Sequence, residues 1–144
     1  MRPKIYIDGQ AGTTALRIRD WLAGRDDLEV MTLPENLRKD PAARKEAIRD
    51  ATIVLLCLPD DAAREAAGWL ADSPVRILDA STAHRVTDGW VYGLPELVAG
   101  QRERIAQAKQ VANPGCYSSA VILLVRPLVD AGLLAPDTPL SIHA

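Results

Sequence analysis

The stretch KIYIDGQAGTTA, residues 4–15, decides the fold of this chain. Its first part, KIYID (residues 4–8), is typical of a short strand, and GQAG (residues 9–12) predicts a tight turn. Apolar residues then recur at helical spacing, at Ala15, Ile18 and Leu22. A strand, a glycine turn and a helix in this order indicate the first βα unit of a parallel sheet.

Short apolar runs and helical patterns alternate along the rest of the chain. Further strands are expected over residues 28–33, 52–58, 75–78 and 110–112. Helices are expected from Pro41 with Asp40 as N-cap, after an N-cap at Asp60 or Asp61, and over residues 95–108 and 117–131. Pro127 should kink or break the last helix, and residues 139–144 look like one more strand. The alternation predicts an α/β fold, a doubly wound parallel sheet of the Rossmann type.

The composition is that of an ordinary globular chain, with 144 residues and a formal net charge of -2. Lys and Arg are scattered among Asp and Glu, so the charge pattern does not favour nucleic acid as a partner. The longest apolar run, residues 120–125, is far too short to span a bilayer, and the N-terminus lacks the apolar core of a signal peptide. We therefore expect a cytoplasmic protein that binds neither nucleic acid nor membrane.

The glycine turn has the spacing G-x-x-G-x-x-A and opens a helix, which suits a dinucleotide pyrophosphate. Small residues let the backbone approach the phosphates, and the helix N-terminus supplies N–H donors. The candidate cofactor-binding residues of the turn are Gly9, Ala11, Gly12, Thr13 and Thr14. Leu58 and Pro59, which follow the apolar run TIVLLC, could line the same cofactor or simply end a strand. An ordinary strand-to-helix turn is the alternative, but the position after the first strand favours dinucleotide binding.

The end of the second expected strand bears on the type of cofactor. An NAD site usually has Asp or Glu there, which binds the ribose 2′-hydroxyl. Here the sequence is TLP, residues 32–34, and the nearest acid is Glu35. Arg38 and Lys39 follow and could meet a 2′-phosphate, or they could be solvated loop charges. The missing acid favours NADP.

The two cysteines lie in different contexts, and neither has the spacing of a metal site or a disulfide. Cys57 lies within an apolar strand and is expected to be a core residue. Cys116 follows NPG, residues 113–115, and precedes a helix, so the turn should place it at a helix N-terminus. Unpaired N–H groups there favour the thiolate, which makes Cys116 the candidate nucleophile. A small, buried and inert cysteine at a helix start is the alternative.

The segment DASTAHR, residues 79–85, should reach the same edge of the sheet. Ser81 could donate to a cofactor phosphate, and Arg85 could hold a phosphate or carboxylate of the substrate together with Asn113. His84 is a possible acid or base, although a solvated side chain in a capped turn is the favoured interpretation. His143 is expected in the core or on a sheet face.

Together these motifs resemble N-acetyl-gamma-glutamyl-phosphate reductase of the shorter type. The matching segments, in order, are DGQAGTTA (residues 8–15), DASTAHR (79–85), YGLPEL (92–97) and NPGCYSSA (113–120). The combination of NPGCY with YGLPEL is highly specific, whereas the glycine turn is not. One departure is Ala15, where Gly is common in the shorter type. The ending APDTPLSIHA is similar to the stretch before the family's glycine-rich LSGYSGGG segment, so the chain is expected to be truncated.

The resemblance implies a two-domain enzyme of arginine biosynthesis, a homo-oligomer when full length, with a small-molecule acyl phosphate as substrate. It would reduce N-acetyl-gamma-glutamyl phosphate with NADPH to N-acetylglutamate semialdehyde and phosphate. Cys116 would attack the acyl phosphate and form a thioester that hydride then reduces. Residues 1–115 would be the NADP-binding domain and residues 116–144 the start of the catalytic domain. The family's catalytic His would lie beyond Ala144.

Two other interpretations remain open from the sequence. Aspartate-semialdehyde dehydrogenase shares the fold and the thioester chemistry, although the PGCY and YGLPEL segments argue against it. A non-catalytic NADP-binding module would bind the cofactor and leave Cys116 unreactive.

Overall fold

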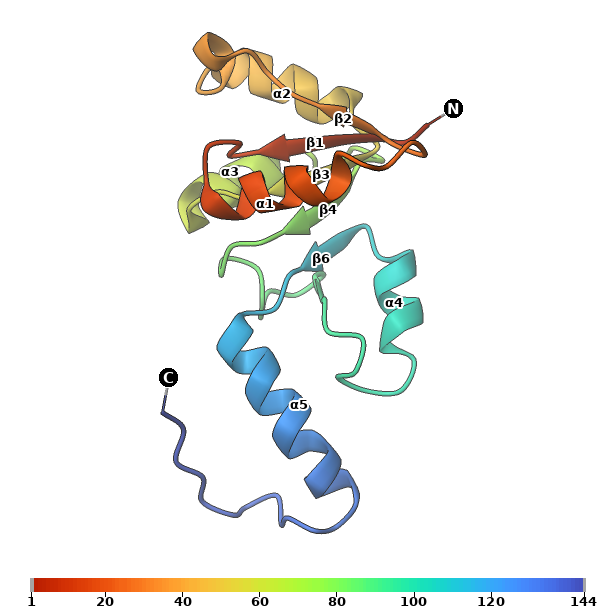
Figure 1. Cartoon of the computed structure of the whole chain (residues 1–144), viewed down its shortest axis with the longest axis vertical. Coiled ribbons are helices and arrows are strands. Elements are labelled where there is room, and N and C mark those ends of the chain that lie inside the picture. The colour runs from red at the N-terminus through yellow and green to blue at the C-terminus, as the bar shows by residue number, and fades with distance from the viewer. Residues whose placement is uncertain (1, 144) are drawn as a thin grey trace.

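The computed structural model describes residues 2–143, which contain a six-stranded parallel sheet (Figure 1). Its strands are β1 (Lys4–Asp8), β2 (Glu29–Met31), β3 (Ile53–Leu56), β4 (Arg76–Asp79), β5 (Val91–Tyr92) and β6 (Gln110–Ala112). They lie in the order β2-β1-β3-β4-β6-β5, and all five pairings are parallel. The expected α/β fold with a doubly wound parallel sheet is confirmed.

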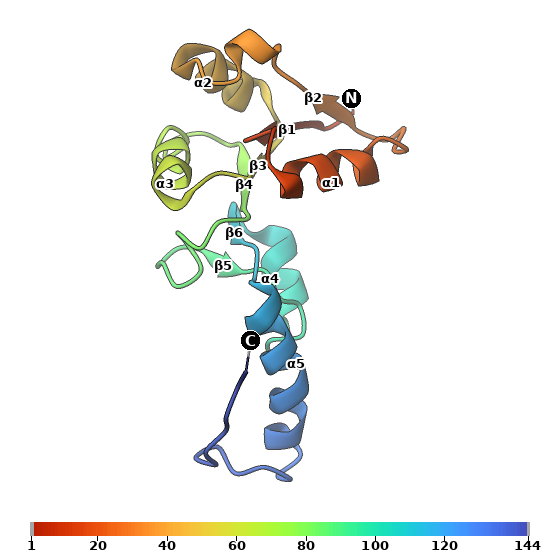
Figure 2. The same ribbon diagram turned by 60° about the vertical axis from the view of Figure 1, so that its left-hand side comes forward.

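Helices cover both faces of the sheet (Figure 2). They are α1 (Thr13–Leu22), α2 (Pro41–Asp50), α3 (Asp60–Gly68), α4 (Gln101–Gln107) and α5 (Cys116–Asp130), with a short 3-10 helix η1 (Glu35–Leu37). Alternate residues of the strands serve two separate cores because strand side chains point to opposite faces. Tyr6, Val54 and Leu56 pack with α2 and α3, whereas Ile5, Ile7 and Leu55 pack with α1. The central strands are therefore apolar on both sides, as a parallel sheet requires.

Helix α2 begins where the sequence predicted. The carboxylate of Asp40 accepts a hydrogen bond from the Ala43 N–H at 2.7 Å, and Pro41 occupies the first helical position. The expectation that Asp60 or Asp61 caps α3 is wrong. Pro59 is the N-cap, and the Asp60 carboxylate accepts hydrogen bonds from the backbone N–H and hydroxyl of Thr82 instead.

Other boundaries differ from the sequence expectations for local reasons. Residues 95–100 form turns rather than the start of a helix, and Gly100 adopts a left-handed φ of 77° as the N-cap of α4. The two-residue strand β5 is too short to leave a sequence pattern. Helix α5 begins at Cys116 and continues through Pro127, so the expected break is absent.

The last part of the described chain differs from the sheet domain in its packing. No residue from 113 to 143 is buried, and α5 extends away from the sheet in both views (Figures 1 and 2). Residues 139–143 are exposed and form no strand, because no neighbouring strand is placed to pair with them; Ala144 lies outside the described residues. His143 is likewise exposed and contacts the Ser141 hydroxyl, so its expected core position is wrong. None of the helices within residues 2–143 has the length and apolarity needed to cross a bilayer.

Candidate cofactor and nucleophile site

The carboxyl ends of β1, β3, β4 and β6 meet at one edge of the sheet, because these strands are parallel neighbours. The glycine turn follows β1, Leu58 and Pro59 follow β3, residues 80–85 follow β4, and Asn113 follows β6. Ligands of open α/β sheets bind at this edge. The candidate site residues from the sequence therefore lie on the loops of one edge or in the first turn of the helix that follows them.

The glycine turn fits closely against the end of β3. Gly9 has a φ of 89°, and a Cβ atom added to it would lie 2.2 Å from the carbonyl oxygen of Cys57. Both facts require glycine at this position. The Gly12 N–H donates to the Gly9 carbonyl at 3.0 Å, which closes the turn directly before α1.

The N-terminus of α1 is shaped for an anion. Gly12 is its N-cap and supplies no side-chain hydrogen bond, so the N–H groups of the first turn are available to a ligand. Thr13 and Thr14 begin the helix and place two hydroxyl side chains at the same end. Backbone N–H groups and the helix dipole together favour a phosphate here. The residues present thus fit a dinucleotide pyrophosphate.

A buried ion pair underlies the turn. The Arg44 guanidinium donates to both carboxylate oxygens of Asp8, at 2.9 Å from Nη2 and 3.1 Å from Nε. The Asp8 side chain is 1% exposed and that of Arg44 12%. Hydrogen bonding to Asp8 raises the pKa of Arg44, and the guanidinium also lies over the Trp69 ring at 5.0 Å. No pattern in the sequence predicts this pair, which joins the end of β1 to α2.

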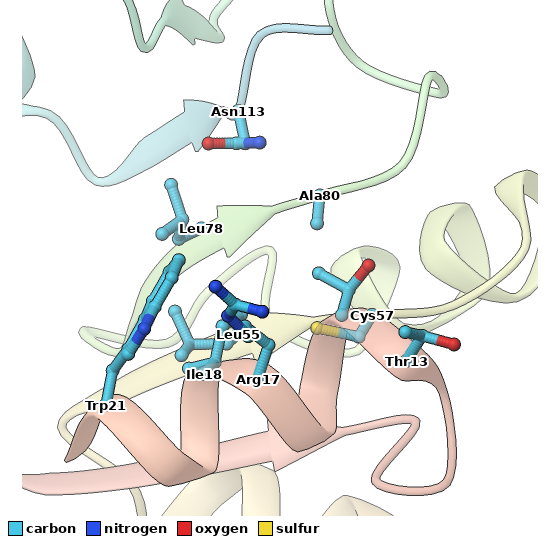
Figure 3. A pocket seen from close by; sticks show the side chains of 10 residues that line it. Thr13, Arg17, Ile18, Trp21, Leu55, Cys57, Leu78, Ala80 and Asn113 are labelled. Atoms are coloured by element: carbon cyan, nitrogen blue, oxygen red, sulfur yellow. The ribbon is translucent and has the colours of Figure 1, made fainter. Parts of the chain in front are cut away.

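Three adjoining hollows run along the edge, and all three include Cys57 in their lining. One of about 590 Å³ extends from the glycine turn to η1 and includes Gly9, Ala11, Gly12, Leu58 and Pro59. A small one of about 170 Å³ lies beside Thr13 and Thr14. The third, of about 710 Å³, has Thr13, Cys57 and Ala80 at one end and Trp21 at the other, with Asn113 across from α1 (Figure 3). The two larger hollows have volumes in the range of small-molecule sites, and the glycine turn lies between them.

Basic and acidic side chains both line the hollow next to η1. Arg38, Lys39 and Arg44 line the hollow of about 590 Å³, together with the acids Asp8 and Glu35. The Nε atom of Arg38 is buried and has no hydrogen-bond partner among the described residues. Both amide atoms of Gln10 in the turn are also buried without partners within residues 2–143. Since buried polar groups are normally satisfied, these atoms are expected to gain partners from a ligand or a local rearrangement.

Cys116 is the first residue of α5 and is exposed. Gly115 is the N-cap of this helix, again without a side-chain cap. The Arg85 guanidinium reaches the same turn, where its Nε donates to the carbonyl of Asn113 at 3.1 Å. On the other side, the hydroxyls of Tyr92 and Ser118 lie 3.0 Å apart, and Ser118 also donates to the Gly115 carbonyl. The thiol is thus presented to solvent at a helix N-terminus that is held from two sides.

Cys57 differs from Cys116 in both burial and chemistry. Burial, followed by the nearby carboxylates of Asp79 and Asp8, raises the pKa of the Cys57 thiol to about 11. At neutral pH this thiol is therefore protonated and a poor nucleophile. The sequence assigned Cys57 to the core, and the structure places it half-buried beneath the three hollows.

The segment from Asp79 to Arg85 is more ordered internally than expected. Ser81 is buried, and its hydroxyl donates to Asp79 at 2.7 Å instead of pointing to a ligand. His84 is only 7% exposed, lies 2.6 Å from Asp79 through Nδ1, and stacks on Trp90 at 3.9 Å. The expectation of a solvated His84 is wrong, because the Asp79 carboxylate and the Trp90 ring both draw the imidazole inward.

The candidate residues fall into two neighbouring groups. Those of the glycine turn, with Leu58, Pro59 and Asn113, line the hollows; Ser81, Arg85 and Cys116 do not line these three. Asn113 joins the groups, since its side chain lines the largest hollow and its carbonyl accepts from Arg85.

Known proteins with similar sequences identify the family of this chain. A family model described as "Semialdehyde dehydrogenase, NAD binding domain" matches residues 14–108. The chain is 60% identical over 142 residues to a protein of Pseudomonas putida named N-acetyl-gamma-glutamyl-phosphate reductase 2. The matched region covers 99% of this chain and 45% of the Pseudomonas protein. It is also 57% identical over 145 residues to the N-acetyl-gamma-glutamyl-phosphate reductase of Brucella ovis. That match covers 100% of this chain and 47% of the Brucella protein. The chain therefore spans about half the length of the curated relatives it matches.

Solved structures agree on the fold. Aspartate semialdehyde dehydrogenase from Francisella tularensis superposes with a TM-score of 0.72 at 16% identity, over 92% of this chain and 42% of that one. The enzyme from Candida albicans, solved with NADP, gives a TM-score of 0.60 at 12% identity, over 91% and 48%. At such identities the likeness concerns the fold alone. The family match also leaves residues 9–13 and Cys116 outside its range, so their roles depend on the geometry described above.

Proposed function

Because the chain belongs to the semialdehyde dehydrogenase family through its NAD-binding domain, we propose that its protein reduces an acyl phosphate to an aldehyde at Cys116. The proposed substrate is N-acetyl-gamma-glutamyl phosphate, and the products are N-acetylglutamate semialdehyde and phosphate, in arginine biosynthesis. The observation that carries this choice is the 54–60% identity to reductases of that name across nearly the whole chain. The aspartate enzymes reach only 12–16% among the structures compared.

In the first step the Cys116 thiolate attacks the acyl carbon. A carbon–sulfur bond forms, the bond from that carbon to the phosphate oxygen breaks, and inorganic phosphate leaves with the electron pair. The exposed position of the thiol at the start of α5 supports this role, because the free N–H groups of the first turn favour the charged sulfur. Arg85, whose guanidinium lies over the same turn, is the proposed partner of the substrate's phosphate or carboxylate, together with Asn113.

The glycine turn and the start of α1 would hold the cofactor. Gly9, Ala11, Gly12, Thr13 and Thr14 surround the proposed pyrophosphate position, and Leu58 and Pro59 would line the adenosine side. When bound, NADPH supplies the hydride that reduces the thioester carbonyl. Ser81 is proposed to act by fixing the loop beside the cofactor, since its hydroxyl is engaged with Asp79.

We infer that NADP is preferred over NAD. No acid occupies residues 32–34 after β2, where an NAD site would have one. Arg38 and Lys39 line the hollow next to the glycine turn, and the buried Arg38 Nε lacks a partner within residues 2–143. A ribose 2′-phosphate would supply the charge-assisted acceptor that this guanidinium lacks.

Residues 116–143 are proposed to begin a second, catalytic unit, with residues 2–115 as the cofactor domain. The absence of buried residues from 113 to 143 supports this division, as do the exposed leucines at 124, 128 and 133. These leucines also support a homo-oligomer or further domain contacts for the whole protein. A cytoplasmic site of action is supported by two unpaired cysteines, and the net charge of -2 offers no basic surface for nucleic acid.

The acyl-transfer step tests this proposal directly. The chain is mixed with N-acetyl-gamma-glutamyl phosphate or with β-aspartyl phosphate, and released phosphate is followed against time. We expect a burst of about one phosphate per chain with the first substrate only, since one thiol is acylated. Cys116→Ser should abolish the burst and Cys57→Ser should keep it. A burst with β-aspartyl phosphate alone would favour the aspartate enzyme, equal bursts with both would contradict the substrate choice, and a burst that survives in Cys116→Ser would refute the assignment of Cys116.

A further inference from the structure

The pair formed by Asp79 and His84 is buried beside the nucleophile turn, and the chemistry above does not use it. Asp79 is fully buried at the end of β4 and accepts hydrogen bonds from the backbone N–H and hydroxyl of Ser81. The His84 Nδ1 lies 2.6 Å from Asp79 Oδ2, the same oxygen that accepts from the Ser81 hydroxyl. With the His84 Nδ1 as donor, three hydrogen bonds converge on this one buried side chain.

These contacts fix the loop between Asp79 and His84 in one shape. The Ser81 hydroxyl accepts from the Ala83 N–H at 3.1 Å, and Thr82 is bound to the Asp60 carboxylate of α3. The imidazole also stacks on Trp90 with an angle of 9° between the rings. His84 is therefore held by a carboxylate from β4 and by a ring from the segment before β5.

The next residue along the chain extends from this fixed loop to the nucleophile turn. Arg85 donates through Nε to the carbonyl of Asn113, three residues before Cys116. Its Nη1 lies 2.8 Å from where a Cβ on Gly115 would be, so the guanidinium occupies the space that a side chain would fill. Arg85 is thus a side-chain link between the loop after β4 and the N-terminus of α5, beside the backbone hydrogen bond from the Asn113 N–H to the Asp79 carbonyl at 2.7 Å.

We propose that His84 is a positioning residue: anchored on Asp79 and Trp90, it holds the Arg85 guanidinium against the Asn113–Gly115 turn and thereby sets the reactivity of Cys116. The proposal rests on the proposed function only in taking Cys116 as the reacting thiol. Because His84 is a direct neighbour of Arg85, a shift of the imidazole moves the Arg85 backbone. The start of α5 would then lose both the cation that lies against Gly115 and the hydrogen bond that fixes the turn.

The test measures the rate at which iodoacetamide alkylates Cys116 in the whole chain, resolved from Cys57 by peptide mass spectrometry. Arg85→Gln removes the cation, and His84→Phe keeps the ring stack but removes the hydrogen bond to Asp79. We expect each to slow alkylation about fivefold, since a nearby cation favours the thiolate. The double variant should be no slower than Arg85→Gln alone, because residues acting through one contact are not additive.

Two controls separate positioning from general loop damage. His84→Asn places an amide nitrogen near the Nδ1 position, and it should restore the rate to within about twofold of the parent. Thr87→Val removes a hydrogen bond from Thr87 to Ala83 in the same loop and should leave the rate unchanged. If His84→Phe does not fold, as judged by urea unfolding, His84→Leu takes its place.

The outcomes distinguish this inference from the proposed function. An unchanged rate in His84→Phe beside a slow Arg85→Gln overturns the inference, as do additive losses in the double variant. An equal loss in Thr87→Val also overturns it, because the effect would then be general loosening. A parent Cys116 that reacts no faster than glutathione contradicts the proposed nucleophile instead, whatever the ratios among the His84 variants.

Discussion

The two cysteines occupy comparable places in the topology but differ in burial. Each follows a parallel strand, Cys57 after β3 and Cys116 after β6, and each lies at the carboxyl edge of the sheet. After β3 the chain continues through Leu58 and Pro59 before α3 starts, so Cys57 stays over the sheet, half-buried, with its pKa raised to about 11. After β6 the Pro114–Gly115 turn makes Cys116 the first, exposed residue of a helix. The turn after the strand, rather than the edge itself, decides how exposed each thiol is.

The largest expected effect is the difference in reactivity between the two thiols. At about pH 7.5 a thiol with a pKa near 11 is almost entirely protonated, and Cys57 is also partly covered. Iodoacetamide should therefore modify Cys116 about 100-fold faster than Cys57. Site-resolved mass spectrometry measures both rates in one sample. Comparable alkylation rates at Cys57 and Cys116 would contradict the proposed difference in reactivity between the two thiols.

A second prediction concerns the contact between the Cys57 carbonyl and the glycine turn. In Gly9→Ala the methyl group would meet that carbonyl at a φ of 89°, so the turn and the end of β3 must separate. We expect a loss of about 2 kcal/mol in the free energy of unfolding and no measurable binding of NADPH by fluorescence titration. Gly24→Ala is the matched control, because nothing lies within 4 Å of its added Cβ. A Gly9→Ala variant as stable as Gly24→Ala would argue against the strained turn.

A third and smaller effect, on NADPH affinity, is expected from Arg38, which lines the hollow between Cys57 and η1. Arg38→Ala should weaken NADPH binding about tenfold and leave NADH binding unchanged, because only NADPH has a 2′-phosphate to pair with the guanidinium. Arg25→Ala removes an exposed cation paired with Asp27 and serves as control. Equal losses for the two nucleotides would place Arg38 elsewhere than at the 2′-phosphate.

The smallest effect expected is a pH dependence of stability contributed by Cys57. Its pKa is higher in the folded chain than its ordinary value of 9.0, so folding favours the neutral thiol. This contribution is fully present below about pH 9 and is lost as the pH rises through about 11. Urea unfolding at about pH 8 and about pH 10.5 should show a steeper loss in the parent than in Cys57→Ala. Identical slopes would mean that the thiol is not desolvated.

The sheet was predictable from the sequence because its strands are apolar on both faces and its turns carry glycine or proline. TIVLLC gives β3, and KIYID gives β1. The boundaries were less predictable where a distant group intervenes. Asp60 binds Thr82, 22 residues away, instead of capping α3, and β5 exists only because β6 pairs with it.

Among the polar residues of the site, too, those that depend on distant contacts were the hardest to predict. The position of Cys116 follows from a local turn, so the sequence alone placed it at the start of a helix. The Asp8–Arg44 pair and the burial of His84 depend on contacts between separate elements, across 36 residues in the first case. Spacing along the chain carries no signal for such contacts, and an isolated histidine in a polar loop gives no indication that a carboxylate and a tryptophan ring enclose it.

The most direct test of the account is to find where the acyl group attaches. The chain is incubated with N-acetyl-gamma-glutamyl phosphate, quenched in acid and digested, and the peptides bearing Cys57 and Cys116 are weighed by mass spectrometry. The account predicts a hydroxylamine-sensitive N-acetylglutamyl group on Cys116, none on Cys57, and no acyl group at all in Cys116→Ala. An acyl group on Cys57, or phosphate release without any acylated cysteine, would contradict it.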